Sequence, residues 1–199
     1  MRLRVGWALA AAAGLVATAT TTARADEASR PYVSGRVGAY LPTGTVPAFG
    51  PNLDVEVAFG YRFLRNVAGE LGFGYYQGTT GALVQELPGG PVTARLSLAA
   101  FPVTASVRGI LPLGRLELSA IGGVGLHFLQ VSIQAGPPTP PSDSDSAVSA
   151  HLGAAATFAV APGFALGLDV RYGWASAKLF GSSMALDGLR AGVVLVVGL

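Results

Sequence analysis

The stretch LDVEVAFGYRF, residues 53–63, alternates strictly between large apolar residues and small or charged ones. Side chains on a β-strand point alternately to opposite faces, so the pattern predicts a strand with two unlike faces. One face carries Leu53, Val55, Val57, Phe59, Tyr61 and Phe63, and the other carries Asp54, Glu56, Ala58, Gly60 and Arg62. A soluble sheet buries the apolar face, whereas a membrane barrel turns it towards lipid. The rest of the chain must decide between them.

The first 25 residues have the features of a secretory signal peptide. A basic start, MRLR, precedes an apolar run to about residue 19, and ARA at 23–25 matches the A-x-A cleavage pattern. The alternative is a membrane anchor helix, but the run is shorter than the ~20 residues that a spanning helix needs. We therefore expect residues 1–25 to be cleaved and residues 26–199 to form one exported domain.

Composition favours a membrane barrel over a soluble domain. Charged residues are 12% of the chain, against the ~25% typical of soluble domains, and Lys178 is the only lysine. The chain has no cysteine, and its best apolar run after the signal peptide, AGVVLVVGL at 191–199, is too short to span a membrane as a helix. Helices and closed barrels are the only structures that span a bilayer, so an exported apolar chain without such a helix predicts a barrel.

The net charge gives no support for a nucleic-acid partner. The signal peptide holds three of the 13 basic residues, and its removal leaves 10 basic against 11 acidic residues. The basic isoelectric point therefore comes largely from the cleaved segment, and we expect no nucleic acid to bind.

The connections between the expected strands alternate in length. We expect eight strands, near 32–41, 52–64, 67–77, 93–111, 115–134, 147–161, 164–177 and 187–199. Long connections rich in Gly, Pro, Ser and Thr alternate with short ones such as Arg65-Asn66 and Pro162-Gly163. Outer-membrane barrels have short periplasmic turns and long extracellular loops. The fold class that we predict is an all-β, eight-stranded antiparallel up-and-down transmembrane β-barrel, with both chain ends in the periplasm.

Apart from the two phase shifts described below, the large apolar residues of each expected strand share one face. The opposite face is mostly Gly, Ala or Ser with an occasional charge, which suits the crowded interior of an eight-stranded barrel. The aromatic residues that we expect to face lipid, near the two interfaces, are Phe59, Tyr61, Phe63, Phe73, Tyr75, Phe158, Phe164, Tyr172 and Trp174.

The inward charges are expected to plug the lumen rather than line a water channel, because buried charges need partners. The expected network comprises Arg36, Asp54, Glu56, Arg62, Glu70, Arg108, Glu117, Asp169, Arg171 and Arg190. Spacing from the connections suggests three pairs, namely Arg62 with Glu70, Arg108 with Glu117, and Arg36 with Asp54.

Two strands change the phase of their apolar residues. Leu96 and Leu98 are out of phase with Phe101, so a β-bulge is expected near Ala99-Ala100, with Pro102 beside it. A similar shift is expected near Leu129-Gln130.

These residues resemble a known family. The signal peptide, the eight strands, LSLAAFPVTASVRGILP around Pro102, SAIGGVGLHF and the final DGLRAGVVLVVGL are similar to the small outer-membrane β-barrel domain proteins of Gram-negative bacteria, such as the OmpA barrel and OmpW. The resemblance covers the whole mature chain. It implies insertion by the barrel-assembly machinery, whose recognition signal usually ends in Phe or Trp, whereas this chain ends in Leu199.

Candidate sites for chemistry are few. His127 and His151 are expected to face the lumen as hydrogen-bonded residues, since no third metal ligand is evident. A Ser149/His151 pair could serve a lipid-directed hydrolase, but inward-facing residues lack access to lipid. Asp143 and Asp145 are expected in a solvated loop, and the glycines of residues 122–125 lie within a strand, not in a phosphate-binding loop.

Three functional classes remain open: a structural or surface-interaction barrel, a narrow channel or transporter for small or hydrophobic solutes, and a lipid-directed enzyme. A soluble secreted β-sandwich is the structural alternative. We favour the first class, as a monomer in the outer membrane with no catalytic residue, metal or cofactor, and with outer-membrane lipid as its main partner.

Overall fold

The computed structural model describes residues 30–44, 52–79, 83–87, 90–134, 142–179 and 181–199. Its strands are β1 (Arg30–Pro42), β2 (Asn52–Leu64), β3 (Val67–Thr79), β4 (Leu83–Leu87), β5 (Gly90–Leu113), β6 (Leu116–Gln134), β7 (Ser142–Ala161), β8 (Phe164–Leu179), β9 (Ser182–Ala185) and β10 (Gly188–Gly198). The described residues include no helix long and apolar enough to cross a membrane.

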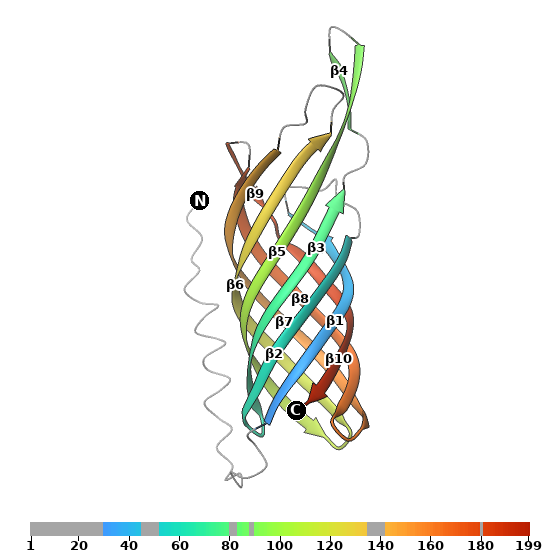
Figure 1. The fold of residues 1–199 in the computed structure, drawn as a ribbon, viewed down its shortest axis with the longest axis vertical. Coiled ribbons are helices and arrows are strands. Elements are labelled where there is room, and N and C mark those ends of the chain that lie inside the picture. The colour runs from blue at the N-terminus through green and yellow to red at the C-terminus, as the bar shows by residue number, and fades with distance from the viewer. Residues whose placement is uncertain (1–29, 45–51, 80–82, 88–89, 135–141, 180) are drawn as a thin grey trace.

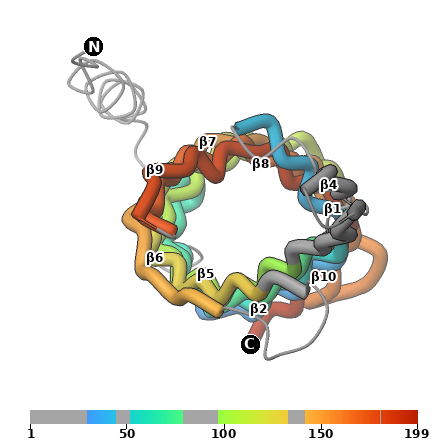
Figure 2. Tube along the Cα trace, turned by 90° about the horizontal axis from the view of Figure 1, so that it is seen from above, coloured from blue at the N-terminus to red at the C-terminus, as the bar shows by residue number. Residues whose placement is uncertain are grey.

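The strands form a closed antiparallel barrel. β10 pairs with both β1 and β8, which joins the two ends of the sheet, and Figure 2 shows the resulting ring from above. Among the described residues the ring consists of eight strands, because β4 pairs only with β5 and β9 only with β8. The predicted eight-stranded antiparallel barrel is confirmed. The segments of β4 and β9 were expected to be irregular connections, but each forms a hairpin, β4 with β5 and β9 with β8.

The two ends of the barrel differ. At one end lie the tight turns at residues 65–66, 114–115 and 162–163, and both β1 and β10 have their free ends there (Figure 1). Gly114 and Gly163 have φ values of 70° and 75°, which non-glycine residues rarely adopt, so the turns depend on them. We call this the short-turn end, and the opposite one the long-loop end.

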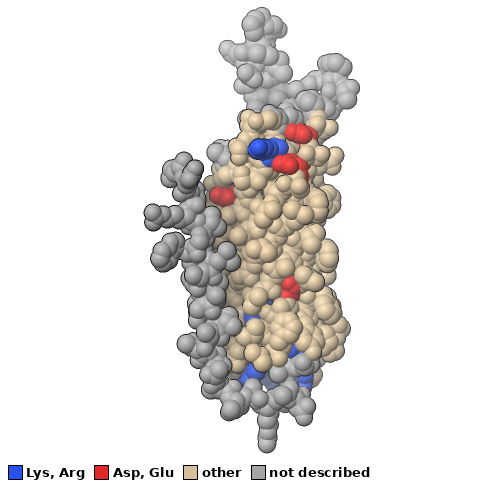
Figure 3. Space-filling view, turned by 90° about the vertical axis from the view of Figure 1, so that its left-hand side faces the viewer, with Lys and Arg blue, Asp and Glu red and all other residues tan. Residues whose placement is uncertain are grey.

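The two faces of each strand are as the sequence predicts. In β2, Val57 is 58% exposed on the outside, while Asp54 is fully buried on the inside. The outward aromatic residues include Phe73, which is 62% exposed. On the face in Figure 3, charged residues lie mainly towards the two ends of the barrel, with a band of uncharged residues between them. The apolar face of LDVEVAFGYRF therefore points outward.

The two predicted phase shifts are wrong. The β5–β6 and β6–β7 registers are continuous past residues 99–100 and 129–130. Leu98, Leu129 and Val131 instead point inward and are buried, because the inner face itself becomes apolar towards the long-loop end. The observed register shifts lie beside two short turns, between Arg62 and Leu64 and between Ala159 and Ala161.

Candidate functional site

A cluster of buried charges fills the middle of the barrel. We call it the central cluster; it consists of Arg36, Asp54, Glu56, Asp169, Arg171 and Arg190. Asp54 binds two arginines, with Arg36 Nη1 2.8 Å from Oδ2 and Arg190 Nη2 2.7 Å from Oδ1. Three arginines face three carboxylates, so the formal charges balance within the cluster.

Glu56 lies at the junction of this cluster. Its carboxylate oxygens are 2.9 Å from Arg171 Nη1, 3.2 Å from Arg36 Nη2 and 3.4 Å from Arg190 Nη1. Arg171 also binds Asp169, two residues away on β8, through Nε at 3.0 Å. Since the side chains are nearly inaccessible to solvent, this mutual pairing offsets the cost of burying charge.

A second set of ion pairs lies nearer the short-turn end. Arg108 binds Glu70 at 2.9 Å, and Arg62 binds Glu117 at 2.8 Å. The expected partners were the reverse, Arg62 with Glu70 and Arg108 with Glu117, so those two pairings are wrong. The third expected pair, Arg36 with Asp54, is confirmed.

The register explains the exchange of partners. Ser106 lies opposite Glu70 across β3 and β5, which places Arg108 diagonally next to that carboxylate. Tyr32 also donates to Glu70, at 2.9 Å. Arg62 on β2 instead reaches Glu117 on β6, past the two strands between them in the ring. Distance from a turn therefore does not predict which charges meet across a narrow lumen.

Towards the long-loop end the lumen is filled by apolar side chains. This apolar cluster consists of Tyr40, Tyr76, Leu98, Ala100, Leu129, Val131, Ala147, Ala175, Ala177, Leu179 and Leu186. The rings of Tyr40 and Tyr76 lie 4.7 Å apart. Tyr40 Oη donates to the carbonyl of Leu186 at 2.8 Å, and the Leu186 amide donates to Ala175 O at 2.8 Å. These bonds hold the chain between β9 and β10 against the barrel interior.

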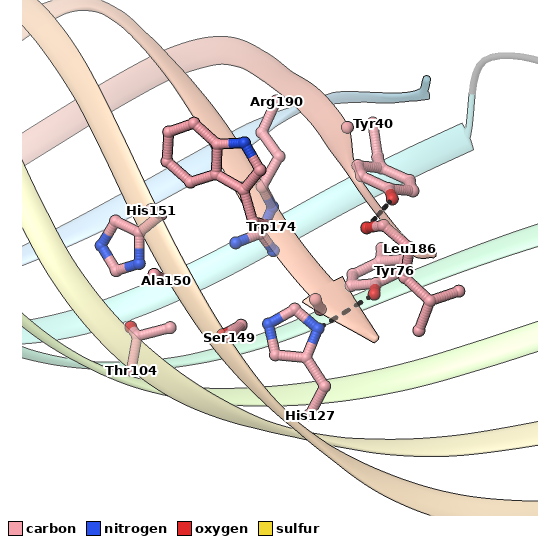
Figure 4. A pocket seen from close by; sticks show the side chains of 13 residues that line it. Tyr40, Tyr76, Thr104, His127, Ser149, Ala150, His151, Trp174, Leu186 and Arg190 are labelled. Carbon is pink, nitrogen blue, oxygen red and sulfur yellow. Dashed lines mark hydrogen bonds between the residues drawn. The ribbon is translucent and has the colours of Figure 1, made fainter. Parts of the chain in front are cut away.

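The two histidines lie between the central and apolar clusters (Figure 4). His127 Nδ1 is 3.1 Å from Tyr76 Oη, and His151 Nε2 is 2.9 Å from Ser106 Oγ. Both are therefore hydrogen-bonded lumen residues, as expected. The cavity beside them has a volume of about 20 Å³, room for about one water molecule.

The structure does not assemble a catalytic or metal site from the sequence candidates. Ser149 Oγ is buried and has no hydrogen-bond partner among the described residues, because His151 binds Ser106 instead. The described residues contain no group of three metal-ligating side chains. Residues 122–125 lie within β6, as expected.

Asp143 and Asp145 lie in a strand, not in the expected solvated loop. Both belong to β7. Asp145 accepts a hydrogen bond from the backbone amide of Lys178 on β8, at 2.6 Å. This bond joins β7 and β8 beyond their paired residues. Residues 135–141, the proline-rich part of the expected loop, lie outside the described residues.

Three inward tyrosines, Tyr32, Tyr40 and Tyr76, were not expected from the sequence, although their phase along the strands indicates them. Tyr32 and Tyr40 are four residues either side of Arg36 and so share its face. Glycine makes room for two of these rings: a Cβ at Gly60 would overlap the ring of Tyr32, and one at Gly188 would overlap Tyr40. The pattern of glycines on neighbouring strands was the available signal.

The predicted outer aromatic residues lie on the outside of the barrel. Near the short-turn end, Tyr61 and Phe63 have ring centroids 5.2 Å apart. Near the long-loop end, Tyr172 and Trp174 form an edge-on pair at 5.0 Å. The full set, Phe59, Tyr61, Phe63, Phe73, Tyr75, Phe158, Phe164, Tyr172 and Trp174, is half-exposed or exposed.

Comparisons with known proteins agree with this architecture. Residues 8–195 match the family model described as the outer membrane protein beta-barrel domain. No curated protein sequence matches the chain significantly.

Three solved structures share the fold at low sequence identity. A major outer membrane protein from Thermus thermophilus has a TM-score of 0.58 at 14% identity, with 87% of this chain and 100% of that chain covered. OprG from Pseudomonas aeruginosa has a TM-score of 0.54 at 12% identity, with 86% of this chain and 96% of that chain covered. Neisserial surface protein A has a TM-score of 0.52 at 13% identity, with 84% of this chain and 96% of that chain covered. Identities this low establish similarity of fold alone.

Proposed function

This chain belongs to the outer membrane protein beta-barrel domain family, and we propose that it acts as a non-conducting barrel with a structural and surface-interaction role. The observation that carries the proposal is the filling of the lumen by two successive layers of side chains. The central cluster occupies the middle, and the apolar cluster lies between it and the long-loop end.

The central cluster favours a plug over an ion path. Each of its arginines is within 4.0 Å of at least two carboxylates, as in Arg36 with Asp54 and Glu56. A passing ion would have to displace one of these arginine–carboxylate contacts. The arginine and the carboxylate would then be separated in a region of low dielectric, and this separation has a high free-energy cost. The cavity beside His127 and His151 has room for about one water molecule, too little for a hydrated solute.

The difference between the two ends of the barrel supports an orientation. We infer that the short-turn end, with the free ends of β1 and β10, faces the periplasm, and that the long-loop end faces outward. The β4–β5 hairpin extends beyond the barrel rim at the long-loop end and offers backbone for contacts outside the cell (Figure 1).

Recording from planar bilayers tests the proposal. Protein whose insertion is verified by heat-modifiable mobility should give no stepwise conductance above the bare bilayer. Regular conductance steps from such protein would favour the alternative, a narrow channel for small solutes. An enzymatic role has less support, because Ser149 and His151 are buried within the lumen; loss of a lipid A acyl chain on expression would contradict this.

A further inference from the structure

The short-turn end of the barrel contains an open cavity that the proposed function does not use. Its volume is about 270 Å³, close to the ~300 Å³ at which small-molecule pockets begin. Its lining includes Arg30, Arg62, Arg108, Arg115 and Glu117. We call it the arginine vestibule.

The arginines of the vestibule are only partly neutralised. Arg62 is paired with Glu117, and Arg108 with Glu70. Arg30, at the start of β1, and Arg115, on the turn between β5 and β6, have no carboxylate within 4.0 Å among the residues that the structure describes. Within the described part of the chain, two positive charges of the vestibule, both at its exposed rim, therefore have no paired carboxylate.

The remaining wall suits a small organic group. The hydroxyl-bearing side chains of Ser119 and Thr157 line the inside, and Ile110 and Val196 provide apolar surface. A ligand here would meet charge at the rim and a mixed polar and apolar wall inside. Arginine presents a planar fork of donors that matches phosphate oxygens in two-point hydrogen bonds.

We propose that the arginine vestibule binds a phosphate-bearing ligand, with Arg30 and Arg115 as its anchoring residues. Arg30 at the start of β1 and Arg115 on the β5–β6 turn bind the phosphate from the two sides of the rim, and the attached organic group enters the cavity that both of them line. Two sources share this chemistry: a soluble organic phosphate from the surrounding water, and the headgroup of an anionic phospholipid in the adjacent leaflet. Binding needs no passage through the barrel, so the proposal is independent of whether the lumen conducts.

Titration calorimetry with glycerol 3-phosphate on the full, folded chain in a non-ionic detergent tests the site. Saturable binding is expected, and the R30Q/R115Q double variant should weaken it by at least about tenfold, because two charge-assisted contacts are lost. Arg65 is the matched control: it is exposed on the neighbouring turn at the same end but does not line the cavity. R65Q should bind within about twofold of the unmodified chain.

Nanodiscs distinguish the two sources of phosphate. If a lipid headgroup occupies the vestibule, phosphatidylglycerol discs should lower the apparent affinity for glycerol 3-phosphate relative to phosphatidylcholine discs, and the double variant should abolish that difference. Equal affinity in both discs identifies a soluble ligand. No saturable binding in detergent or in either disc at millimolar concentration, or an equal loss in R65Q and R30Q/R115Q, would overturn the proposal. Heat-modifiable mobility verifies that each variant is folded.

Discussion

Arg190 and Asp54 are joined across the closing seam of the barrel, with 2.7 Å between Nη2 and Oδ1, although β1 lies between their strands. Asp54 also binds Arg36 on β1, at 2.8 Å. One carboxylate on β2 therefore holds arginines from the first and the last strand of the ring. This connection supplements the backbone hydrogen bonds between β1 and β10.

Removing the charge of Asp54 should destabilise the barrel strongly. Asp54→Asn leaves Arg36 and Arg190 buried with fewer carboxylates, and breaking a buried pair in this way costs roughly 3–5 kcal/mol. Urea titration of the folded barrel in lipid vesicles measures the loss. Lys178→Gln, an exposed charge change near the long-loop end, should stay within about 0.5 kcal/mol. Equal stability of both variants would show that the central cluster contributes little.

A charge introduced on the outer face should lower the stability of the barrel more, the nearer it lies to the middle of the membrane. Val57→Arg places a cation near the middle of the band of uncharged residues and should cost ~2–4 kcal/mol. Leu64→Arg changes an equally exposed residue at the short-turn end, where the expected cost is ~0–1 kcal/mol. The same urea titration compares them. If Val57→Arg proved no worse than Leu64→Arg, the apolar face would not contact the lipid core.

The fit between Gly60 and Tyr32 should be sensitive to a single methyl group. Gly60→Ala forces the Tyr32 ring out of place and should cost ~1–3 kcal/mol. At Gly35 a Cβ meets nothing within 4 Å, so Gly35→Ala should be neutral or slightly stabilising. In a Tyr32→Leu background the cost of Gly60→Ala should fall, as a double-mutant cycle would show. An unchanged cost would mean that the ring is not the obstacle.

Tyr76 should be the main aromatic support of the apolar cluster. It contacts Tyr40, hydrogen-bonds His127 and lies beneath Arg190, whose guanidinium carbon is 5.5 Å from the ring centroid. Tyr76→Ala should cost roughly 3–5 kcal/mol through the cavity that it leaves. Tyr76→Phe removes only the hydroxyl and should cost about 1 kcal/mol. Thermal unfolding followed by circular dichroism separates the two, and similar losses would assign the effect to the hydrogen bond.

The two ion pairs near the short-turn end should differ in coupling energy. Arg108 and Glu70 are buried, so removing either partner leaves an uncompensated charge and coupling should exceed about 1.5 kcal/mol. The side chains of Arg62 and Glu117 are 28% and 32% exposed, so water screens them and about 1 kcal/mol or less is expected. Double-mutant cycles measure both terms. A cycle between Arg62 and Glu70 should show weaker coupling than that between Arg108 and Glu70.

The strands and their faces could be predicted because the alternation in LDVEVAFGYRF and its counterparts is a local property. The short turns, too, are marked by nearby residues such as Gly114 and Gly163. Which inward charges pair is not local. Arg62 met Glu117 rather than Glu70 because neighbours in the lumen depend on strand tilt and stagger, which no single strand encodes.

The wrong bulges have a related cause. Apolar residues identify the outer face of a strand only along the part of the barrel where the inner face is polar. Around Leu98 and Leu129 the inner face is apolar while the outward neighbours include Ser97 and Gln130, so the change of phase in the sequence reflects a change in what fills the lumen. The register gives no break there. Hydrophobic periodicity alone cannot distinguish a bulge from a second apolar surface.

The position of Asp54 and Glu56 on β2 has a consequence for assembly. Arg190 lies on the last strand of the ring, whereas its two carboxylate partners, Asp54 and Glu56, lie on the second. Before β10 meets β1, these groups cannot reach one another, so an unclosed sheet carries unsatisfied charge at the site of its future seam. Closure of the ring and neutralisation of Arg190 are therefore coupled, and a sheet that has not closed lacks the stabilisation that the ion pairs of this arginine give to the finished barrel.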